Sequence, residues 1–323
     1  MKDDLNIETY QFNRKYEIMF INLLTEMYGD KYSEKIAFIK SKNNPIYKRI
    51  KFRNFIYKSI TTECLGHITA FFYKNNQKIG YIGFYESIKD YKISDLLIRK
   101  VEEFLKKSGC NKIIVTNNFN NLYQSKICNN QRLFNFDPIS QYYYKEQFYK
   151  RGYKDFIKYV SAERDNLNRI LMYLSKSKID RNYRINTVRK DNYINYLNDI
   201  YDIVSEIWRK SFTKSEFNYN YSYLLSRIPN FIIYLVYYKN IPIAICFNLI
   251  ENGKLIIKTI GVLKEHRNKG IGDYLIYISH KLAEKNNSRV IYAIMDLKSL
   301  LANNKHPKDY KILKEYSILY KEL

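Results

Sequence analysis

Residues 262–272 read Val-Leu-Lys-Glu-His-Arg-Asn-Lys-Gly-Ile-Gly, and the fold is inferred outward from this stretch. An apolar run at residues 255–262 leads into it, and a helical pattern at residues 273–284 follows it. We therefore expect a turn between a strand and the start of a helix. Such a turn exposes unpaired backbone N–H groups at the positive end of a helix dipole, and these groups bind anions.

Two glycines and two cations suit this turn to a diphosphate. Gly270 and Gly272 have no side chain, so the backbone can approach phosphate oxygens closely. Arg267 and Lys269 add positive charge. The spacing Arg-x-x-Gly-x-Gly differs from the P-loop, which needs Lys and Ser or Thr after its second glycine, and from the Gly-x-Gly-x-x-Gly of dinucleotide-binding folds. The alternative interpretation is an ordinary basic turn before a helix.

The second half of the chain has the element order of one α/β unit. Period-2 patterns and turn residues predict strands at residues 184–188, 231–238, 243–250, 255–262, 289–295 and 316–320. Helical spacing predicts helices at residues 193–212, 273–284 and around 305–313. The sequence Glu-Asn-Gly-Lys at residues 251–254 is a strong hairpin signal.

The first half repeats this order without the glycine-rich turn. It carries predicted helices at residues 18–28 and 93–107, and predicted strands at residues 66–73, 78–85 and 112–115. Where the turn should stand, residues 86–92 lack a glycine pair and contain Glu86 and Asp90. Since like charges repel, we expect no diphosphate site in the first half.

The turn at residues 262–272 resembles the acyl-CoA pyrophosphate loop of the GNAT superfamily of N-acyltransferases. The usual pattern of that loop is Val-x-Pro-x-x-Arg/Gln-x-x-Gly-x-Gly/Ala. Val262, Arg267, Gly270 and Gly272 match it, and Lys264 stands where the family usually has Pro. This departure removes some rigidity from the turn.

The whole chain resembles a family of bacterial tandem GNAT proteins with a degenerate first domain. The first-half matches lie at residues 66–68, 80–86, 117–120, 137–138 and 142–143. The resemblance implies an α/β fold with a mixed sheet in each of two GNAT-like domains. We expect a degenerate domain at residues 1–165, a helical linker at 166–182 and a domain with the acyl-CoA loop at 183–323.

The resemblance also implies acetyl-CoA or another acyl-CoA as co-substrate. No metal is expected, because the sequence has no Cys and His cluster with metal-ligand spacing. The diphosphate would be held by the loop, and the pantetheine arm would run beside a splayed strand pair and be held further along by an asparagine. Carried over to this chain, the cofactor-binding residues are Ile260, Val262, Arg267, Asn268, Lys269, Gly270, Ile271, Gly272 and Asn303.

The family pattern further places a tyrosine about seven residues after that asparagine, on the last helix. Asn303 and Tyr310 fit this spacing, so Tyr310 is the expected proton donor to the CoA thiolate. The pKa of a phenol, near 10, is close to that of a thiol, so the transfer is nearly balanced. The alternatives are a packing role for Tyr310, or a register that uses Asn304 and places Lys311 at the tyrosine position.

The general base stays unassigned. Glu206, Glu251 and His266 are candidates, and a base acting through water is another. Residues 218–221, Asn-Tyr-Asn-Tyr, are expected in a polar loop that contacts the acceptor, whereas Trp208 is expected in the core.

Composition limits the classes of protein that this chain can belong to. The length of 323 residues suits two domains, and 46% hydrophobic residues provide for real cores. No apolar run of about 18 residues occurs, so no membrane span is expected. Four scattered cysteines without metal spacing indicate a reduced, cytoplasmic setting. The net charge of +23 favours an anionic cofactor or an acidic carrier protein; because the basic residues are spread along the chain, it is weak support for nucleic acid.

The leading hypothesis is an N-acyltransferase that moves an acyl group, in the first instance acetyl, from acyl-CoA to a primary amine of a small molecule or amino-acid derivative. The first domain would shape the acceptor cleft. One alternative keeps the fold and takes the acyl group from an acyl carrier protein or an aminoacyl-tRNA. Another is a non-catalytic regulatory protein that binds acyl-CoA.

Overall fold

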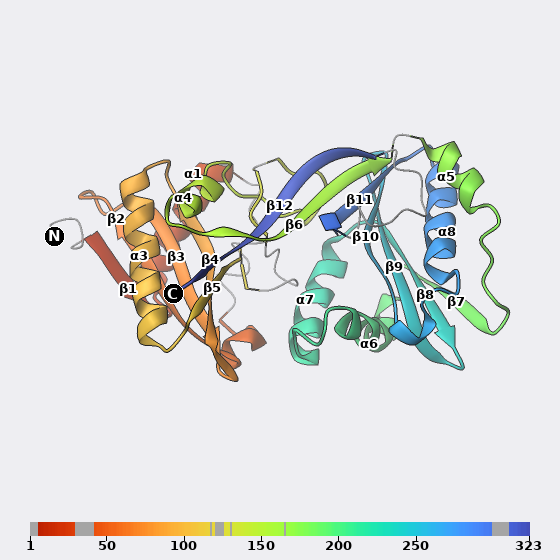
Figure 1. Cartoon of the computed structure of the whole chain (residues 1–323), viewed down its shortest axis with the longest axis horizontal. Coiled ribbons are helices and arrows are strands. Elements are labelled where there is room, and N and C mark those ends of the chain that lie inside the picture. The colour runs from red at the N-terminus through yellow and green to blue at the C-terminus, as the bar shows by residue number, and fades with distance from the viewer. Residues whose placement is uncertain are drawn as a thin grey trace. The chain divides into compact units, whose positions relative to one another are not determined.

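The computed structural model describes residues 6–29, 42–116, 118–119, 126–129, 131–164, 166–298 and 310–323, and the structural statements below concern these residues. The chain divides into two compact units, Met1–Lys158 with Tyr316–Leu323, and Tyr159–Glu315. Each unit is a mixed sheet with helices packed on its faces (Figure 1). None of the described helices is long and apolar enough to cross a membrane.

The first unit is built on strands in the order β1-β2-β3-β4-β5-β12, with β4 and β5 parallel. The helix α3 covers one face, where Leu97, Val101 and Leu105 are fully buried against the sheet. The helix α1 contributes Phe20 and Leu24 to a second core. The bounds are β1 Ile7–Tyr10, α1 Arg14–Tyr28, η3 Pro45–Lys48, β2 Ile50–Lys58, β3 Cys64–Tyr73, β4 Asn76–Ser87, α3 Tyr91–Lys107, β5 Lys112–Val115, α4 Tyr144–Lys150 and β12 Tyr310–Glu322.

The second unit has the strand order β6-β11-β10-β9-β8-β7, with β10 and β11 parallel. The helix α8 packs on β9 and β10 through Ile271 and Leu275, and α6 also packs on these two strands. The bounds are β6 Lys154–Arg164, α5 Leu167–Leu174, β7 Tyr183–Val188, η5 Tyr193–Tyr196, α6 Leu197–Ile207, α7 Lys214–Arg227, β8 Phe231–Tyr238, β9 Ile241–Glu251, β10 Lys254–Val262, η6 Lys264–His266, α8 Ile271–Lys285 and β11 Arg289–Asp296.

Each sheet takes one strand from the other half of the sequence, an arrangement that we call the strand exchange. In the first unit, β5 pairs antiparallel with β12, from Leu319↔Val115 to Glu322↔Lys112. In the second unit, β11 pairs antiparallel with β6, and Ile291 lies opposite Glu163. The expectation that residues 316–320 form the last strand of the second domain is therefore wrong. Both halves of the sequence predict the same element order, and this order does not indicate which sheet a strand joins.

The division of the chain also differs from the expected boundaries at 165 and 183. The first boundary falls inside β6, between Lys158 and Tyr159, and the last residues belong to the first unit. The expected linker at 166–182 contains α5, which packs on α8 as part of the second unit.

Most predicted strands of the second half are confirmed, and three predictions need correction. Residues 193–212 are not one helix, because α6 ends at Ile207 and Arg209 and Lys210 have left-handed φ angles of 53° and 51°. Residues 218–221 lie in α7 rather than in a polar loop. Of the expected helix at 305–313, residues 310–313 belong to β12 and the others lie outside the described residues.

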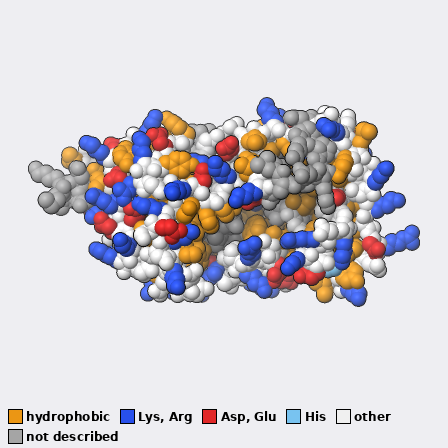
Figure 2. Space-filling model, in the orientation of Figure 1, with side chains coloured by type: hydrophobic (Ala, Val, Ile, Leu, Met, Phe, Trp, Pro, Cys, Tyr) orange, Lys and Arg blue, Asp and Glu red, His pale blue; other side chains and the backbone are white. Residues whose placement is uncertain are grey.

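Lysine and arginine side chains are scattered over the face seen in Figure 2, with acidic side chains between them. This face shows no single basic stripe of the kind that binds a nucleic-acid backbone. The excess of positive charge is thus distributed over the surface of the described residues seen in that view.

Candidate active site

The candidate site begins where β10 separates from β11. The two strands pair in parallel over residues 254–257 of β10, whereas β10 pairs with β9 as far as Val262. Where this parallel pairing ends, the register of β10 against β9 shifts directly after Ile257. The register of β11 against β6 shifts beyond Tyr292. Within the described part of the chain, β10 therefore forms no ladder with β11 over residues 258–262, which we call the open edge. This geometry is what the splayed strand pair of the sequence analysis requires.

The turn after β10 ends in a helix start without a side-chain cap. Asn268 and Gly270 have left-handed φ angles of 61° and 76°, which brings the backbone round to α8. Gly270 is the N-cap and makes no side-chain cap hydrogen bond, and its carbonyl accepts the N–H of Tyr274 at 2.9 Å. The first-turn N–H groups of Ile271 and Gly272 thus lie at the positive end of the α8 dipole, where an anion is stabilised.

The predicted loop residues lie together around this helix start. Arg267, Asn268 and Lys269 are exposed. Arg267 Nε donates a hydrogen bond to the carbonyl of Val262 at 3.0 Å, which ties the turn to the end of β10. Ile271 is 1% exposed and belongs to the core, so only its backbone N–H can contribute to a ligand site.

Ile260 and Val262 lie on the open edge and pack their side chains against the core beneath α8. Their backbone groups, and not their side chains, are therefore what they can offer to a pantetheine arm. The hydrogen-bonding direction of a strand lies in the plane of the sheet, toward the side on which β11 has moved away.

The corresponding helix start of the first unit is closed by its own residues. The carboxylate of Asp90 caps α3 by accepting the N–H groups of Lys92 at 2.7 Å and Ile93 at 3.3 Å. Glu86 is fully buried and accepts the phenol of Tyr144 at 2.6 Å. Asp90 thus takes the N–H groups that a phosphate would need, and it brings negative charge to the position.

Tyr310 lies at the start of β12, and not on a last helix as expected. Its phenol oxygen accepts a hydrogen bond from Arg164 Nη2 at 2.6 Å, and the Arg164 guanidinium lies 4.1 Å from the centre of its ring. Its ring also packs edge-on against Tyr292 at 5.7 Å. The partner proposed for it, Asn303, lies outside the described residues, as does Asn304.

None of the three candidate bases is placed at the open edge. Glu251 ends β9 at the hairpin, roughly 25 Å along β10 from Val262 at the rise of a strand. Glu206 is half exposed and pairs with Lys210 at 3.0 Å. His266 lies in the loop, where its Nδ1 is 3.2 Å from the hydroxyl of Tyr183.

The expected acceptor segment at residues 218–221 is helical and partly core. Tyr221 is 3% exposed, stacks on Phe217 at 4.2 Å and has its pKa raised by burial. Trp208 is half-buried at the C-cap of α6 and contacts Phe212 edge-on at 5.8 Å. The tyrosine content of the sequence concealed the helical period, because Tyr serves equally on buried and exposed faces.

One residue of the open edge was missed by the sequence analysis. Lys258 occupies the register shift of β10, and its Nζ lies 5.9 Å from the ring centre of Phe247. Burial lowers the pKa of Lys258 to about 8. A lysine inside the mainly apolar run at residues 255–262 was the available signal, since a lysine seldom occupies such a position without a role.

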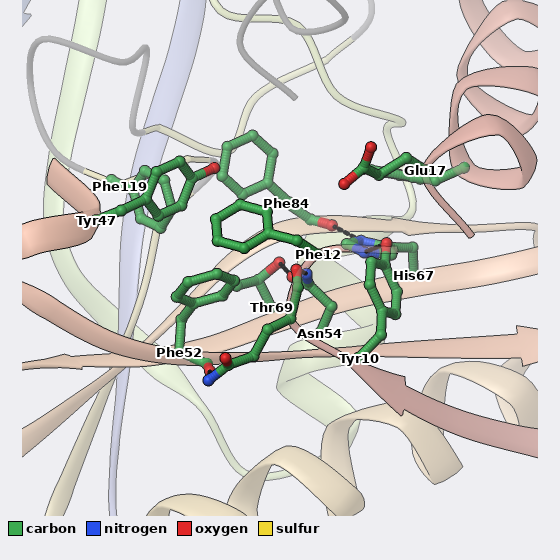
Figure 3. Close-up of a pocket in the computed structure, with 12 residues that line it drawn as sticks. Tyr10, Phe12, Glu17, Tyr47, Phe52, Asn54, His67, Thr69, Phe84 and Phe119 are labelled. Carbon is green, nitrogen blue, oxygen red and sulfur yellow. Dashed lines mark hydrogen bonds between the residues drawn. The ribbon is translucent and has the colours of Figure 1, made fainter. Parts of the chain in front are cut away.

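The first unit contains a separate, mainly aromatic pocket between α1 and the sheet (Figure 3). Its polar groups bond largely to one another: the hydroxyl of Tyr10 lies 3.0 Å from His67 Nε2, and Thr69 donates to Asn54 at 2.6 Å. His67 Nδ1 also lies 2.9 Å from the carbonyl of Phe84. The pocket is thus distinct from the closed helix start of α3.

Comparison with known proteins agrees with this geometry. Residues 197–302 match the Acetyltransferase (GNAT) family. A tandem GNAT protein from the clavulanic acid biosynthesis pathway is similar over 98% of both chains, at 9% identity and a TM-score of 0.60. A probable N-acyltransferase from Enterococcus faecalis V583 is similar over 98% of this chain and 72% of its own, at 10% identity and a TM-score of 0.58.

A GCN5-related N-acetyltransferase from Anabaena variabilis ATCC 29413 also has a TM-score of 0.58, at 10% identity, over 98% of this chain and 72% of its own. At these identities the likeness shows the fold alone. No protein with curated function matches the chain. The open edge and the uncapped helix start thus belong to an acetyltransferase fold. Residues 197–302 match the GNAT family, and the described chain has the fold of a tandem GNAT protein.

Proposed function

We propose that the protein is an N-acyltransferase that transfers an acyl group, in the simplest case acetyl, from acyl-CoA to a primary amine of a small molecule or amino-acid derivative. The observation that carries this proposal is the continuity of the open edge with the uncapped start of α8. The open edge offers backbone groups to the amides of the pantetheine arm. The helix start offers N–H groups to the diphosphate.

The exposed cations of the turn support the same donor. Arg267 and Lys269 lie beside the helix start and are exposed, so both can approach the phosphates of CoA. The diphosphate is thus held by backbone N–H groups and by two exposed charges. With its diphosphate held at the helix start, acyl-CoA has its thioester positioned along the strand. Such positioning alone removes a large entropic part of the activation barrier of acyl transfer.

Tyr310 is our candidate for the proton donor to the departing thiolate. Its hydroxyl lies at the start of β12, where Arg164 Nη2 donates to its oxygen at 2.6 Å, and a phenol has a pKa close enough to that of a thiol for a nearly balanced proton transfer. Support for the reduced, cytoplasmic setting comes from the four cysteines, all of which are free thiols.

The proposal is tested in two steps with the full chain. Calorimetry with acetyl-CoA should give binding at one site, and a thiol-release assay with a panel of primary amines should give turnover that depends on the amine. Replacing acetyl-CoA by longer acyl-CoA donors then defines the acyl preference. If acetyl-CoA does not bind, the assignment of the site is wrong; if it binds and no amine accelerates thiol release, the protein is a binding protein instead.

A further inference from the structure

Lys258 lies at the point where β10 leaves β11. The last parallel pair joins Ile257 to Tyr292, and the register of β10 against β9 changes before Thr259. Lys258 is therefore the inserted residue of a β-bulge, a feature that re-aims a side chain. Its position is the inner end of the open edge, along which the proposed acyl donor would lie.

The side chain of Lys258 approaches Phe247 on the face of the sheet opposite α8. Phe247 is fully buried on β9, next to Cys246, whose sulfur contacts Ser279 of α8 on the other face. The face of Phe247 is the one covered by α6, since a Cβ at Gly261 would strike Ile207 of that helix at 2.2 Å. Lys258 is thus half-buried beside the Phe247 ring, on the face of the sheet that α6 covers.

The acidic groups on the elements around Lys258 have other partners. On α6, Asp199 accepts the hydroxyl of Tyr237 at 2.5 Å, and Glu206 pairs with Lys210. On α7, Glu216 accepts the N–H of Thr213 at 2.6 Å in the helix cap.

On the other neighbouring strands, Glu163 of β6 pairs with Arg289 of β11 at 3.2 Å, Glu251 lies at the far end of β9, and Asp296 ends β11. On α8, Asp273 lies in the first turn. Within the described residues, Lys258 forms no ion pair with any of these groups, and Phe247 is its contact. Its charged form is therefore poorly compensated, and burial lowers its pKa to about 8. At pH 7 about a tenth of the molecules carry the neutral amine, far more than for an ordinary lysine.

We propose that Lys258 is the general base of the reaction, taking a proton from the acceptor amine at the open edge. This inference rests on the proposed function. The acceptor arrives as an ammonium ion and gives one proton to Nζ of neutral Lys258. The nitrogen of the acceptor amine then attacks the thioester carbonyl, the new C–N bond forms and the C–S bond breaks. The departing sulfur takes the phenolic proton of Tyr310. The attacking nitrogen releases its second proton, which restores the phenol by way of solvent, and Lys258 returns its proton to solvent.

The chemistry of the strand favours this assignment over the earlier candidates. The strand β10 contains no carboxylate, and its other lysine, Lys254, lies at the paired end. A base whose pKa is close to the working pH combines a useful neutral fraction with a sufficient affinity for the proton. Lysine fulfils this role in proteins when it is desolvated.

The test compares Lys258→Met and Lys258→Arg with Lys254→Met, a matched control on the same strand. The assay uses acetyl-CoA and the amine of the panel that the parent protein acetylates fastest. We expect both Lys258 variants to lose roughly 10²- to 10⁴-fold in kcat, the usual range for a lost general base, with acetyl-CoA affinity changed less than about twofold. The arginine variant keeps the charge and cannot become neutral, so its loss separates a base from an electrostatic role.

The pH profile supplies a second readout. In the parent, kcat/KM should rise with pH and level off above about 8, and this inflection should be absent from both Lys258 variants. An active parent whose Lys258→Met variant matches the Lys254→Met control in kcat and in pH profile would overturn the role of Lys258 and leave the proposed function standing. A parent that acetylates no amine would overturn the proposed function, and this role with it.

Discussion

Gly272 offers the cleanest test of the diphosphate site at the level of one residue. A Cβ built there lies 3.9 Å from Val262 Cγ2, an ordinary contact, so a side chain can be added without moving the backbone. We expect Gly272→Glu to weaken acetyl-CoA binding roughly 10- to 100-fold, since each lost hydrogen bond to a charged group costs about 1.5–3 kcal/mol. Calorimetry measures the change.

The matched control is Gly272→Ala, which adds only the methyl group that the geometry accommodates. It should bind acetyl-CoA within a few-fold of the parent. Gly270 is unsuitable for this comparison, because its φ of 76° and the carbonyl of Lys178 at 3.4 Å make any side chain a source of strain. Equal affinities of the Glu and Ala variants would show that the diphosphate binds elsewhere.

The proposed role of Tyr310 as a proton donor can be tested by removing only its hydroxyl group. Tyr310→Phe keeps the ring contact with Tyr292 and removes the phenol that accepts from Arg164. We expect kcat to fall roughly 10²- to 10⁴-fold, toward the smaller value because water can supply the proton, with acetyl-CoA binding nearly unchanged. Steady-state assays measure kcat, and the dependence of single-turnover assays on acetyl-CoA concentration measures its binding. Full kcat in the Phe variant would make Tyr310 a packing residue.

Lys258 also has a signature in stability that needs no substrate. Burial lowers its pKa to about 8, whereas the unfolded chain has the ordinary value near 10.4. Below pH 8 both states carry the charge, and its burial destabilises the folded state fully. Between pH 8 and 10.4 the folded state has released its proton and the unfolded state has not, so the penalty fades as pH rises.

We therefore expect Lys258→Met to melt at a higher temperature than the parent at pH 7, and this advantage to shrink toward pH 10. Thermal melts at pH 7, 8.5 and 10 check the trend, with Lys254→Met as the control that should show no such trend. An advantage that stays constant across this range would mean that Lys258 titrates in the same way in both states.

At the level of elements, the starts of α3 and α8 differ in a way that determines where CoA can bind. The helix α3 is capped by the side chain of Asp90, and α8 begins at a glycine without a side-chain cap. Asp90→Ala should lower the free energy of unfolding by about 0.5–2 kcal/mol, the usual contribution of an N-cap. It should leave the stoichiometry at one CoA per chain, because α3 also lacks the glycine pair.

Denaturant unfolding and calorimetric titration measure these two effects. The variant Glu103→Ala on the same helix is a suitable control, because the side chain of Glu103 is 48% exposed and its ion pair with Lys100 lies on the surface. Two CoA molecules per chain in the parent protein would contradict the closed state of the first helix start.

Helices and strands could be predicted from the sequence where a short stretch of neighbouring residues carries the signal. The hairpin at Asn252 and Gly253 was predicted from two residues, and both have the left-handed φ angles that such a turn needs. The strand β8 and the helix α8 have strong periods, and their boundaries fell within two residues. The helix α7 was missed because its tyrosines lie on both faces, although Thr213 and Glu216 form a capping box that could have marked its start.

In the candidate site too, residues that are neighbours in the sequence could be predicted, and residues placed by strand pairing could not. The loop from Arg267 to Gly272 is contiguous, so its residues could be assigned before the structure was known. Lys258 depends on a bulge and on the separation of two strands, which are properties of pairing and not of sequence pattern. Tyr310 was assigned by spacing, and its place on β12 shows that spacing alone does not give the element.

At the level of the whole molecule, the strand exchange couples distant parts of the sequence. Leu319 is fully buried in the core of the first unit, and Tyr316 donates its hydroxyl to Asp137 there at 2.8 Å. We expect Leu319→Ala to destabilise by about 2–5 kcal/mol, the usual cost of a large-to-small change in a core. The loss of protection in hydrogen exchange should appear first in β5 and not in β8.

The control is Glu322→Ala on the same strand, since the side chain of Glu322 is 65% exposed and makes a surface ion pair that contributes little. Protection lost in β8 while β5 stays protected would mean that β12 supports the second unit instead.

The strand exchange also determines when the first unit can be completed during synthesis. A ribosome makes β1 to β5 long before it makes residues 319–322, which cover the edge of β5. Until then the nascent first unit carries an open strand edge, which is a template for pairing with other chains. We therefore expect chains that stop upstream of β12 to keep this edge unpaired and to aggregate more readily than the full chain.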